Sequence, residues 1–597
     1  MTIHSKKYTL FDFIKITFKS SPVLTAVRII DKIIYALIPS FTALVMAGFV
    51  NTALEIFEGK QDRQDIYPYL LFIMLIIAHQ TVDRTLIDFV FAKMKMKLNE
   101  SFKTAVIEKR AKLEYRHIEN SDTWDLINRT CEDPASRIYS GFDHSLRMFD
   151  MFIRVGSLLA ILFGQVWWAG IVIILFSVPL FRLAVKSGKT NYEAFKNAAQ
   201  HERRAGYLHE VLTGREYVEE RTMFGYTDRL NQKWYDKFET ARKINLSVQL
   251  KNYIKNKGGS TLTVVIWLGI VCVLIPPLGN GELTAGMFIG LSAASFSLVQ
   301  MVSWEMSYVT SELANNHEYM KDLSSFAALS EQTGALDLPC RENTGFEKLE
   351  FINVSFKYPG TEKYILKNCS FVIEKNRHYA FVGVNGAGKT TITKLLTGLY
   401  PDFEGQILID GKKLSEYSQS QLKAMFTVVY QDFARYYISM RDNIMLGDIN
   451  NIGDLSNRQA EQAANLINLK PVIENLPDKL DTALGKIKEN GVDLSGGEWQ
   501  RVAIARTLAS GAPVRILDEP TAALDPIAES NMYEMFGEIS AGKTTVFITH
   551  RLGAAKLADE IFVIDDGNIA EQGSHAELLS QNGIYTRMFE SQRSWYI

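Results

Sequence analysis

The stretch GVNGAGKT, residues 383–390, combines closely spaced glycines with a lysine and a threonine, which are residue types suited to binding phosphate. Its glycines are Gly383, Gly386 and Gly388. They allow backbone N–H groups to turn inward around phosphate oxygens, while Lys389 can reach the terminal phosphates and Thr390 can hold Mg²⁺. An apolar run before the loop predicts a strand, and the run after it predicts a helix. The stretch therefore indicates a site for a magnesium nucleoside triphosphate.

Two acidic residues, Asp518 and Glu519, follow an apolar run within VRILDEP, residues 514–520. We expect Asp518 to hold the magnesium shell and Glu519 to polarise an attacking water molecule. The alternative is an acidic turn without a chemical role. Arg515 interrupts the apolar run, and because central parallel strands are buried on both faces we expect it at the solvated start of the strand.

A second glycine-rich segment, LSGGE at residues 494–498, stands before a run with helical spacing of apolar residues. Ser495, Gly496 and Gly497 form the predicted start of that helix, where free N–H groups and the helix dipole favour an anion. The segment has no lysine, so it cannot form a complete phosphate site alone. An ordinary serine-capped helix is the alternative.

The C-terminal part of the chain, from residue 346 onward, resembles the nucleotide-binding domain of an ATP-binding-cassette (ABC) transporter. The resemblance rests on an ordered series of motifs. These are Tyr358 in FKYPG, the phosphate loop 383–390, Gln431 in VVYQDF, LSGGE at 494–498, LDEP at 517–520, ALDP at 523–526 and ITH ending at His550. The family implies that the cofactors are ATP and Mg²⁺.

The resemblance also implies a role for each matching residue. Tyr358 would stack on adenine, Gln431 would contact Mg²⁺ and the attacking water, and His550 would bind the γ-phosphate and hold Glu519. Asp525 would lie where two cassettes meet. The alternatives are a strand-end tyrosine, a loop glutamine, a core histidine and a turn residue. The implied catalytic set is Glu519, His550 and Gln431; the metal set is Thr390, Gln431 and Asp518; Asn385 and Thr391 join the nucleotide-binding set.

The family places LSGGE over the γ-phosphate held by a second cassette, so the missing lysine implies a dimer. Each chain would give Lys389 and Glu519 to one site and Ser495 to the other. The catalytic motifs are complete, which favours a homodimer, although an active half of a heterodimer would have the same sequence. Asn376 stands where relatives usually have a turn glycine, and asparagine tolerates the left-handed backbone. Glu489 is the expected residue for signalling between cassettes.

Apolar segments in the first half of the chain are long enough to cross a membrane, which needs about 20 residues. The predicted spans are residues 30–52, 67–89, 148–167, 168–187, 259–279 and 284–306. The connections after the second and fourth spans are long, charged and helical in pattern, so we expect the second to fifth helices to continue far into the cytosol. Because Lys and Arg gather in these connections, both termini and the cassette should be cytosolic. The basic, amphipathic N-terminus predicts an interfacial helix.

The whole chain is similar to the exporter branch of the family. We therefore expect a membrane α-helical bundle of six transmembrane helices with long cytosolic extensions, followed by an α/β P-loop cassette. The expected domains are 1–330 for the membrane domain, 331–347 for a linker and 348–597 for the cassette. The expected location is the cytoplasmic (plasma) membrane of a bacterium. An ATP-gated channel or regulator on the same fold is the alternative function.

The exported substrate is open between peptides, lipids and drugs. The stretch EYRHIENSDTWD resembles a group of bacterial exporters that includes lantibiotic and other peptide exporters. The N-terminus leads directly to the first span, so we do not expect a peptidase domain or coupled leader cleavage. The net charge of −2 and the membrane spans argue against a nucleic-acid partner or a soluble ATPase of DNA repair or translation.

The family couples its two halves through short helices at the tips of the long extensions, which match residues 120–127 and a segment within 215–230. Trp124 would fill a groove on the cassette; the alternative is a solvated bend. Arg147, Asp150 and Arg154 share a helix face, at or near the predicted membrane-spanning region. Such residues either line an aqueous cavity or pair with one another for packing, and we favour pairing.

Overall fold

The computed structural model describes residues 1–168, 201–341, 345–451, 456–486, 491–521 and 542–593 continuously, with single positions between them. It divides into two compact units, and each is described by itself. The first unit comprises Met1–Arg110 and Asp125–Leu329, and the second comprises Ala111–Trp124 and Ser330–Ile597.

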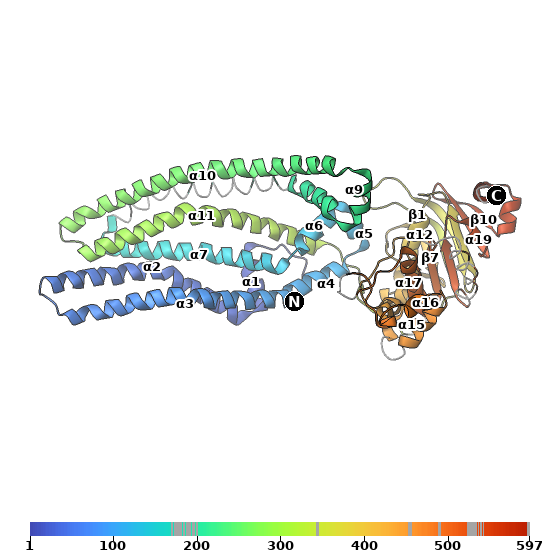
Figure 1. The fold of residues 1–597 in the computed structure, drawn as a ribbon, viewed down its shortest axis with the longest axis horizontal. Coiled ribbons are helices and arrows are strands. Elements are labelled where there is room, and N and C mark those ends of the chain that lie inside the picture. The colour runs from blue at the N-terminus through green and yellow to red at the C-terminus, as the bar shows by residue number, and fades with distance from the viewer. Residues whose placement is uncertain are drawn as a thin grey trace. The chain divides into compact units, whose positions relative to one another are not determined.

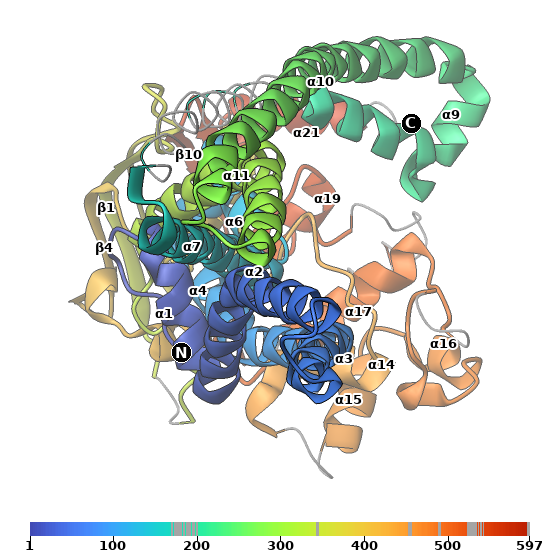
Figure 2. The ribbon, with the colours of Figure 1, turned by 90° about the vertical axis from the view of Figure 1, so that its left-hand side faces the viewer.

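The first unit is built from helices, of which several are very long and run side by side (Figure 1). Its described helices are α1 (Leu10–Ser20), α2 (Pro22–Phe57), α3 (Tyr67–Leu98), α4 (Thr104–Lys112), α6 (Ser121–Cys131), α7 (Pro134–Gln165), α9 (Val218–Phe224), α10 (Thr227–Gly279) and α11 (Ala285–Ala328); α4 and α6 cross the unit boundary. A π-helical turn, Asn99–Lys103, joins α3 to α4. Seen end-on in Figure 2, α2 lies beside both α3 and α11.

Five of the predicted spans coincide with helices of this unit. Residues 30–52 lie in α2, 67–89 in α3, nearly all of 148–167 in α7, 259–279 in α10 and nearly all of 284–306 in α11. The fourth predicted span, 168–187, lies almost entirely outside the described residues. Among described helices, α2 alone has a continuous apolar window long enough to cross a membrane, and shorter apolar helices occupy Trp267–Gly279 and Ala285–Ser297.

The long helices extend well beyond the length that a bilayer can cover. Helix α10 has 53 residues, which at 1.5 Å per residue gives about 80 Å. The hydrocarbon core of a membrane is only about 30 Å thick. The expectation that the membrane helices continue past the bilayer is therefore confirmed for α10 by its length.

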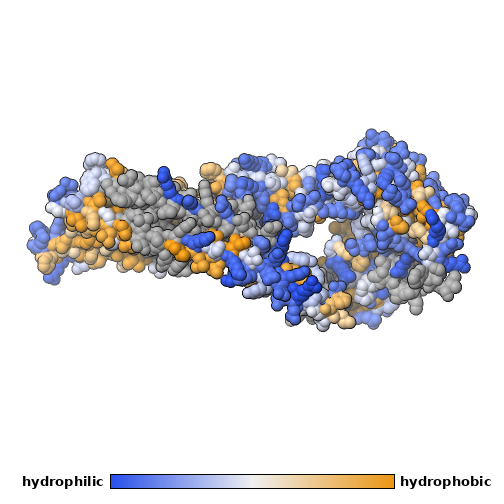
Figure 3. All heavy atoms as spheres, turned by 90° about the horizontal axis from the view of Figure 1, so that it is seen from above, coloured by the Kyte–Doolittle hydropathy of each residue, from blue (hydrophilic) through white to orange (hydrophobic). Residues whose placement is uncertain are grey.

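Large apolar side chains cover much of the outer surface of this unit (Figure 3). On α2 and α3 they include Ile30, Leu37, Phe41, Leu44, Leu71, Phe72, Leu75 and Ile77, all exposed. Exposing so many apolar side chains to water is unfavourable, and lipid chains are the natural cover for such helices.

Helix α1 packs against α7 at a very close approach. Phe13 and Ile16 of α1 are buried, and a Cβ atom added at Gly141 of α7 would lie 2.2 Å from the Phe13 ring. Phe11, on the other side of α1, is 82% exposed. Glycine at 141 is therefore what lets the two helices meet here.

The charged residues of α7 form ion pairs, as we expected from the sequence. The guanidinium of Arg154 lies 2.8 Å from the carboxylate of Asp150, and both side chains are nearly buried. Arg147 pairs with Asp143 at 2.8 Å, and Asp143 also accepts from Arg28 at 3.1 Å. Buried charges are tolerated when they are paired in this way.

The second unit contains two sheets. The antiparallel sheet has the order β2-β1-β4-β5, and the larger sheet has the order β10-β9-β3-β8-β7-β6. The strands are β1 (Lys348–Phe356), β2 (Leu366–Glu374), β3 (His378–Gly383), β4 (Glu404–Ile409), β5 (Lys412–Lys413), β6 (Phe426–Val429), β7 (Val514–Asp518), β8 (Thr544–Ile548), β9 (Glu560–Asp565) and β10 (Asn568–Gly573). Strands β3, β6, β7, β8 and β9 run parallel.

Helices surround these sheets. They are α5 (Tyr115–Glu119), α12 (Lys389–Leu396), α13 (Gln419–Met425), α14 (Met440–Met445), α15 (Ser456–Asn465), α16 (Lys470–Glu474), α17 (Gly496–Ala509), α19 (Leu552–Ala555), α20 (His575–Ser580) and α21 (Ile584–Arg593). Asn376 has φ +58°, as expected for a residue standing where a turn glycine is usual.

The core of the larger sheet positions the chemistry. Strands β7 and β8 are buried along their whole length, as expected for central parallel strands. Strands β3, β8 and β7 are parallel neighbours, so their C-terminal ends lie at one edge of the sheet. These ends are Gly383, Ile548 and Asp518. The phosphate loop, the acidic pair and His550 follow directly from these three strand ends.

The expected position of Arg515 is wrong. Arg515 lies inside β7 and is only 3% exposed. Its guanidinium donates to the carbonyl oxygen of Thr507 at 3.3 Å, in the last turn of α17. The carbonyl groups at a helix C-terminus favour a cation, which explains why this strand accepts an arginine. Burial lowers the pKa of Arg515 to about 10.

Candidate nucleotide-binding site

The phosphate loop joins β3 to α12 through glycines whose backbone no other residue fits. Gly383 has φ +153° and Gly388 has φ +108°. A Cβ atom at Gly383 would lie 2.3 Å from the carbonyl oxygen of Ile564, and one at Gly388 would lie 2.7 Å from Leu366. The strand on one side and the helix on the other are as the sequence predicted.

Lys389 is the first residue of α12, and its side chain turns back into the loop. Its Nζ donates to the carbonyl oxygens of Gly383 at 2.9 Å and Val384 at 3.0 Å. Burial lowers the pKa of Lys389, while the carboxylates of Glu519 and Asp518 act in the opposite direction. The loop thus surrounds a buried ammonium group, as a triphosphate-binding loop requires.

Asp518 is the last residue of β7 and is 1% exposed. Neither of its carboxylate oxygens has a hydrogen-bond partner among the described residues. Burial raises the pKa of Asp518 to about 6, against the influence of the nearby Thr390 hydroxyl. A buried carboxylate without partners is costly. The arrangement fits a divalent cation, for which carboxylate and hydroxyl oxygens are suitable ligands.

Glu519 is held between Gln431 and His550. Its Oε2 accepts from Gln431 Nε2 at 3.0 Å, and its Oε1 lies 2.6 Å from His550 Nε2. The three residues of the predicted catalytic set therefore meet. Burial is the main cause that lowers the pKa of His550, followed by the nearby Lys389.

The backbone of Glu519 is unusual. Its φ is +49°, in the left-handed region that glutamate rarely adopts. Its N–H donates to the carbonyl oxygen of Ile548 at 2.8 Å, and its own carbonyl accepts from Gln500 at 3.3 Å. Strained backbone of this kind is often found at functional sites. Gln500 could not be singled out from the sequence, because a glutamine in a helix interior carries no distinct signal.

Tyr358 lies beside the start of α12. Its hydroxyl is 3.0 Å from the hydroxyl of Thr391, the residue that follows the phosphate loop. Its ring contacts the rings of Phe356 and Tyr400 edge-on, at centroid distances of 5.2 and 5.6 Å. The tyrosine expected to stack on adenine is therefore next to the phosphate loop.

The LSGGE segment forms the exposed start of α17. Ser495 is the N-cap: its hydroxyl accepts from the N–H of Glu498 at 3.3 Å, and its N–H donates to the Glu498 carboxylate at 2.7 Å. Ser495 and Gly496 are exposed. This capping box leaves the helix N-terminus open to an anion. Asp525 and Glu489, the residues expected at cassette contacts, lie outside the described residues.

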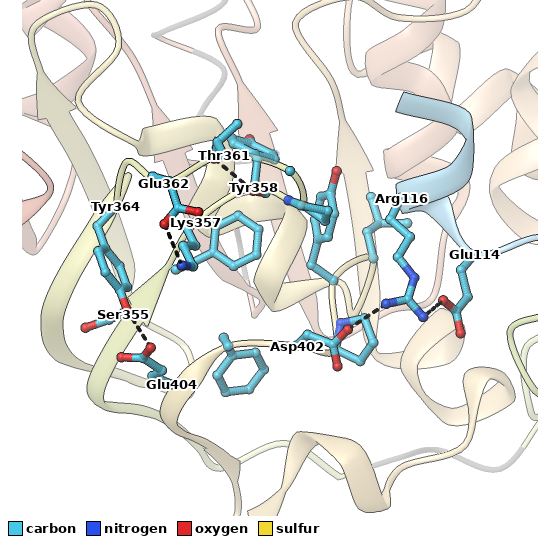
Figure 4. A pocket seen from close by; sticks show the side chains of 17 residues that line it. Glu114, Arg116, Ser355, Lys357, Tyr358, Thr361, Glu362, Tyr364, Asp402 and Glu404 are labelled. Carbon is cyan, nitrogen blue, oxygen red and sulfur yellow. Dashed lines mark hydrogen bonds and ion pairs between the residues drawn. The ribbon is translucent and has the colours of Figure 1, made fainter. Parts of the chain in front are cut away.

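Residues 111–124 belong to the second unit, where α5 contacts the cassette. Arg116 pairs with Asp402 at 3.0 Å, and Glu119 pairs with Lys394 at 2.7 Å. Figure 4 shows Arg116 pointing toward Asp402 at the border of a cavity of about 710 Å³ that Tyr358 also lines. These ion pairs come from α5, one turn before the predicted segment 120–127. Asn120 immediately precedes α6, and its side-chain oxygen accepts from the N–H of Asp122 at 3.0 Å, as expected for a residue at a helix start.

Comparison with known proteins decides the family. Residues 23–302 match the family described as ABC transporter transmembrane region, and residues 366–522 match the ABC transporter family. The chain belongs to the ABC transporter family. The transporter is 30% identical to the ATP-dependent lipid A-core flippase of Pseudomonas aeruginosa, over 91% of this chain and 88% of that protein.

Two further relatives are named for the transport of subtilin and of nisin, and a solved structure shares the fold. The subtilin transport ATP-binding protein SpaT of Bacillus subtilis is 29% identical over 85% of this chain and 82% of its own. The nisin transport ATP-binding protein NisT of Lactococcus lactis is 27% identical over 98% of this chain and 96% of its own. The structure of a bacterial Atm1-family ABC exporter with ATP bound matches 95% of the chain and 98% of its own, with a TM-score of 0.76 and 24% identity.

The fold class expected from the sequence is thus confirmed: a helical membrane domain is followed by an α/β cassette. The transporter binds ATP and couples its hydrolysis to export across a membrane. One chain carries a single membrane domain and a single cassette, so it is a half-transporter that acts as part of a dimer.

Proposed function

We propose that two copies of this chain form a homodimeric exporter that works by alternating access. Each of two ATP molecules binds between Lys389 of one chain and Ser495 of the other, the cassettes close, and the membrane domain turns outward. Hydrolysis resets the inward-facing state. The observation that carries this proposal is the cluster of Gln431, Glu519 and His550, since a complete hydrolytic set in every chain suits two active sites.

Glu519 is the general base in this mechanism. Its carboxylate accepts the proton of the attacking water, and the contacts with Gln431 and His550 keep it in place. Gln431 orients that water molecule, and His550 also donates to the γ-phosphate. Lys389 and the backbone N–H groups of the phosphate loop hold the charge of the triphosphate.

Mg²⁺ completes the proposed site. The open carboxylate of Asp518, the hydroxyl of Thr390 and the side chain of Gln431 are the groups that would hold it. When bound, the ion neutralises charge on the phosphate oxygens. The buried and unpartnered oxygens of Asp518 support this assignment.

The proposed cargo is a lipid or a peptide, and it is supported by relatives that are named for lipid A-core, subtilin and nisin. The proposed location is the cytoplasmic membrane of a bacterium, with the cassette and both termini in the cytosol. The bacterial relatives and the lysine- and arginine-rich extensions support this orientation.

The test of the hydrolytic mechanism is the ATPase rate of Glu519→Gln in the full-length transporter. We expect a loss of about 100-fold or more in kcat, the usual effect of removing a general base. Glu590→Gln makes the same chemical change at an exposed position of α21 and should keep the wild-type rate. A wild-type rate in Glu519→Gln would contradict the role of Glu519.

The test of export is movement of a lipid or peptide into inside-out vesicles against its gradient. A channel or regulator on the same fold would carry current or bind a partner without uphill movement. The intact hydrolytic cluster favours the exporter. Accumulation that depends on ATP and disappears in Glu519→Gln is the expected result.

A further inference from the structure

We propose that Lys394 and Tyr400 link helix α5 to the ring of Tyr358, so that docking of α5 sets the affinity of the site for ATP. This inference rests on the proposed role of Tyr358 in stacking on adenine. It assigns positioning roles to residues that do not touch the nucleotide, and it assigns Glu119 as the group that holds both of them.

Glu119, the last residue of α5, binds two groups of the cassette at once. One carboxylate oxygen lies 2.7 Å from Nζ of Lys394, and the other accepts from the hydroxyl of Tyr400. The side chain of Lys394 is 15% exposed, whereas that of Glu119 is 38% exposed, so water screens this ion pair from one side only. Burial lowers the pKa of Lys394, but the hydrogen bond with Glu119, together with the nearby Tyr358 and Tyr115, keeps this pKa above its usual value.

Both groups that bind Glu119 also contact the ring of Tyr358. Nζ of Lys394 lies 5.2 Å from the ring centroid, within the range of a cation–π interaction. The ring of Tyr400 meets it edge-on at 5.6 Å and is itself buried. The Tyr358 side chain also contacts Phe356 and the hydroxyl of Thr391. One carboxylate of α5 therefore binds two of the groups that contact the Tyr358 ring.

The same ammonium group also binds the aromatic residue of α5. Nζ of Lys394 lies 5.4 Å from the ring centroid of Tyr115, and Tyr115 meets Tyr400 edge-on at 5.6 Å. Lys394 thus stands between an aromatic ring of α5 and the aromatic ring expected to receive adenine. A lysine that loses Glu119 gains by turning toward water, because its flexible chain and strongly hydrated ammonium favour exposure.

Docking of α5 therefore preorganises the Tyr358 ring. A ring already fixed in orientation loses less freedom when a base stacks on it, which increases affinity. The coupling is reciprocal: a nucleotide that stabilises the Tyr358 ring also stabilises the contacts of Lys394 and Tyr400 with α5. The cavity that Arg116 and Tyr358 both line shows that α5 and the adenine tyrosine border one space.

The experiment measures KM for ATP and kcat of the full-length transporter in detergent or nanodiscs. We expect Lys394→Met to raise KM about threefold to tenfold, with kcat changed less than about twofold. Glu119→Gln should raise KM in the same direction, and the double variant should show less than the product of the two effects. Lys394→Arg should restore KM, because arginine keeps both the charge and the stacking.

Two controls separate this link from a loss of folding. Lys375→Gln removes an exposed lysine of a 2.6 Å ion pair with Glu347 on the same unit, and it should leave KM unchanged. Tyr400→Phe removes only the hydroxyl that Glu119 accepts from, so a rise in KM there reports the link rather than packing.

The proposal fails if Glu119→Gln leaves KM unchanged while Lys394→Met raises it, or if Lys394→Met still raises KM in a Tyr358→Ala background. It also fails if Tyr358→Ala alone leaves KM unchanged, since Tyr358 would then not bind adenine. None of these results would alter the loss of hydrolysis in Glu519→Gln, so failure of the link and failure of the proposed mechanism are distinguishable.

Discussion

The Nε2 atom of His550 lies 2.6 Å from the carboxylate of Glu519, although 30 residues of chain separate the two. Parallel pairing of β7 with β8 brings the two residues together, because Glu519 directly follows the end of β7 and His550 closely follows the end of β8. This contact holds the proposed base in a fixed direction.

Replacing His550 should therefore lower catalysis more than binding. We expect His550→Ala to reduce kcat about 10- to 100-fold with a small change in KM for ATP, because a misaligned base loses much of its effect. Steady-state ATPase assays measure both constants. His575→Ala is the matched control, since His575 contacts Tyr585 and Phe589 rather than the site. An equal loss in both variants would contradict the positioning role of His550.

Mixing two inactive variants should restore one active site if ATP lies between two chains. Lys389→Ala removes the phosphate-binding lysine, and Ser495→Arg blocks the helix start. A mixed dimer then has one site with both groups intact and one with neither. We expect up to half of the wild-type ATPase rate per mixed dimer, purified through two different tags. If each site were built within one chain, the mixed dimer would remain inactive.

Removing the charge of Asp518 should stabilise the metal-free protein while destroying its function. The carboxylate is buried and has no hydrogen-bond partner among the described residues, and burial raises its pKa to about 6 even beside Lys389, so its charged form costs stability. In EDTA, we expect Asp518→Asn to raise the Tm of the cassette transition. With Mg²⁺ and ATP the order should reverse, because the variant has lost a ligand. A lower Tm in EDTA would mean that Asp518 has an unseen stabilising partner.

A methyl group at Gly383 should prevent the phosphate loop from forming. It would approach the Ile564 carbonyl to 2.3 Å, and the left-handed φ adds strain. We expect Gly383→Ala to lose about 2 kcal/mol or more of stability and most ATP binding, measured by thermal unfolding and nucleotide titration. Gly511→Ala meets no atom within 4 Å and should behave as the wild type.

In the membrane unit, Gly141 should be equally sensitive. Its Cβ would collide with the Phe13 ring, whereas the Cβ of Gly156 on the same helix would meet nothing within 4 Å. We expect Gly141→Ala to lower the thermal stability in detergent and Gly156→Ala to leave it unchanged. Equal stability of the two variants would show that α1 is not held at this position.

The sequence predicted those parts of the site that lie next to a strand end. Gly383, Asp518 and His550 each follow an apolar strand, so their meeting at one sheet edge follows from parallel pairing. The long helices were predictable because their charged extensions keep helical spacing. Arg515 was not, because its partner, the Thr507 carbonyl, depends on where α17 ends.

Contacts between residues far apart in the chain could also not be predicted from the sequence. The pairing of Glu119 with Lys394 joins residues 275 positions apart, and no sequence pattern links the two. The cassette contacts of α5 lie one turn before residues 120–127, the segment that the sequence had indicated. Gln500 was missed for the same reason, since its role comes from a single contact with the backbone of Glu519.

The 53 residues of α10 also make that helix a lever. A stiff rod of about 80 Å converts a tilt of about 5° at one end into a displacement of roughly 7 Å at the other. The length of α10 therefore amplifies a tilt of a few degrees at one end into a movement of several ångströms at the other end.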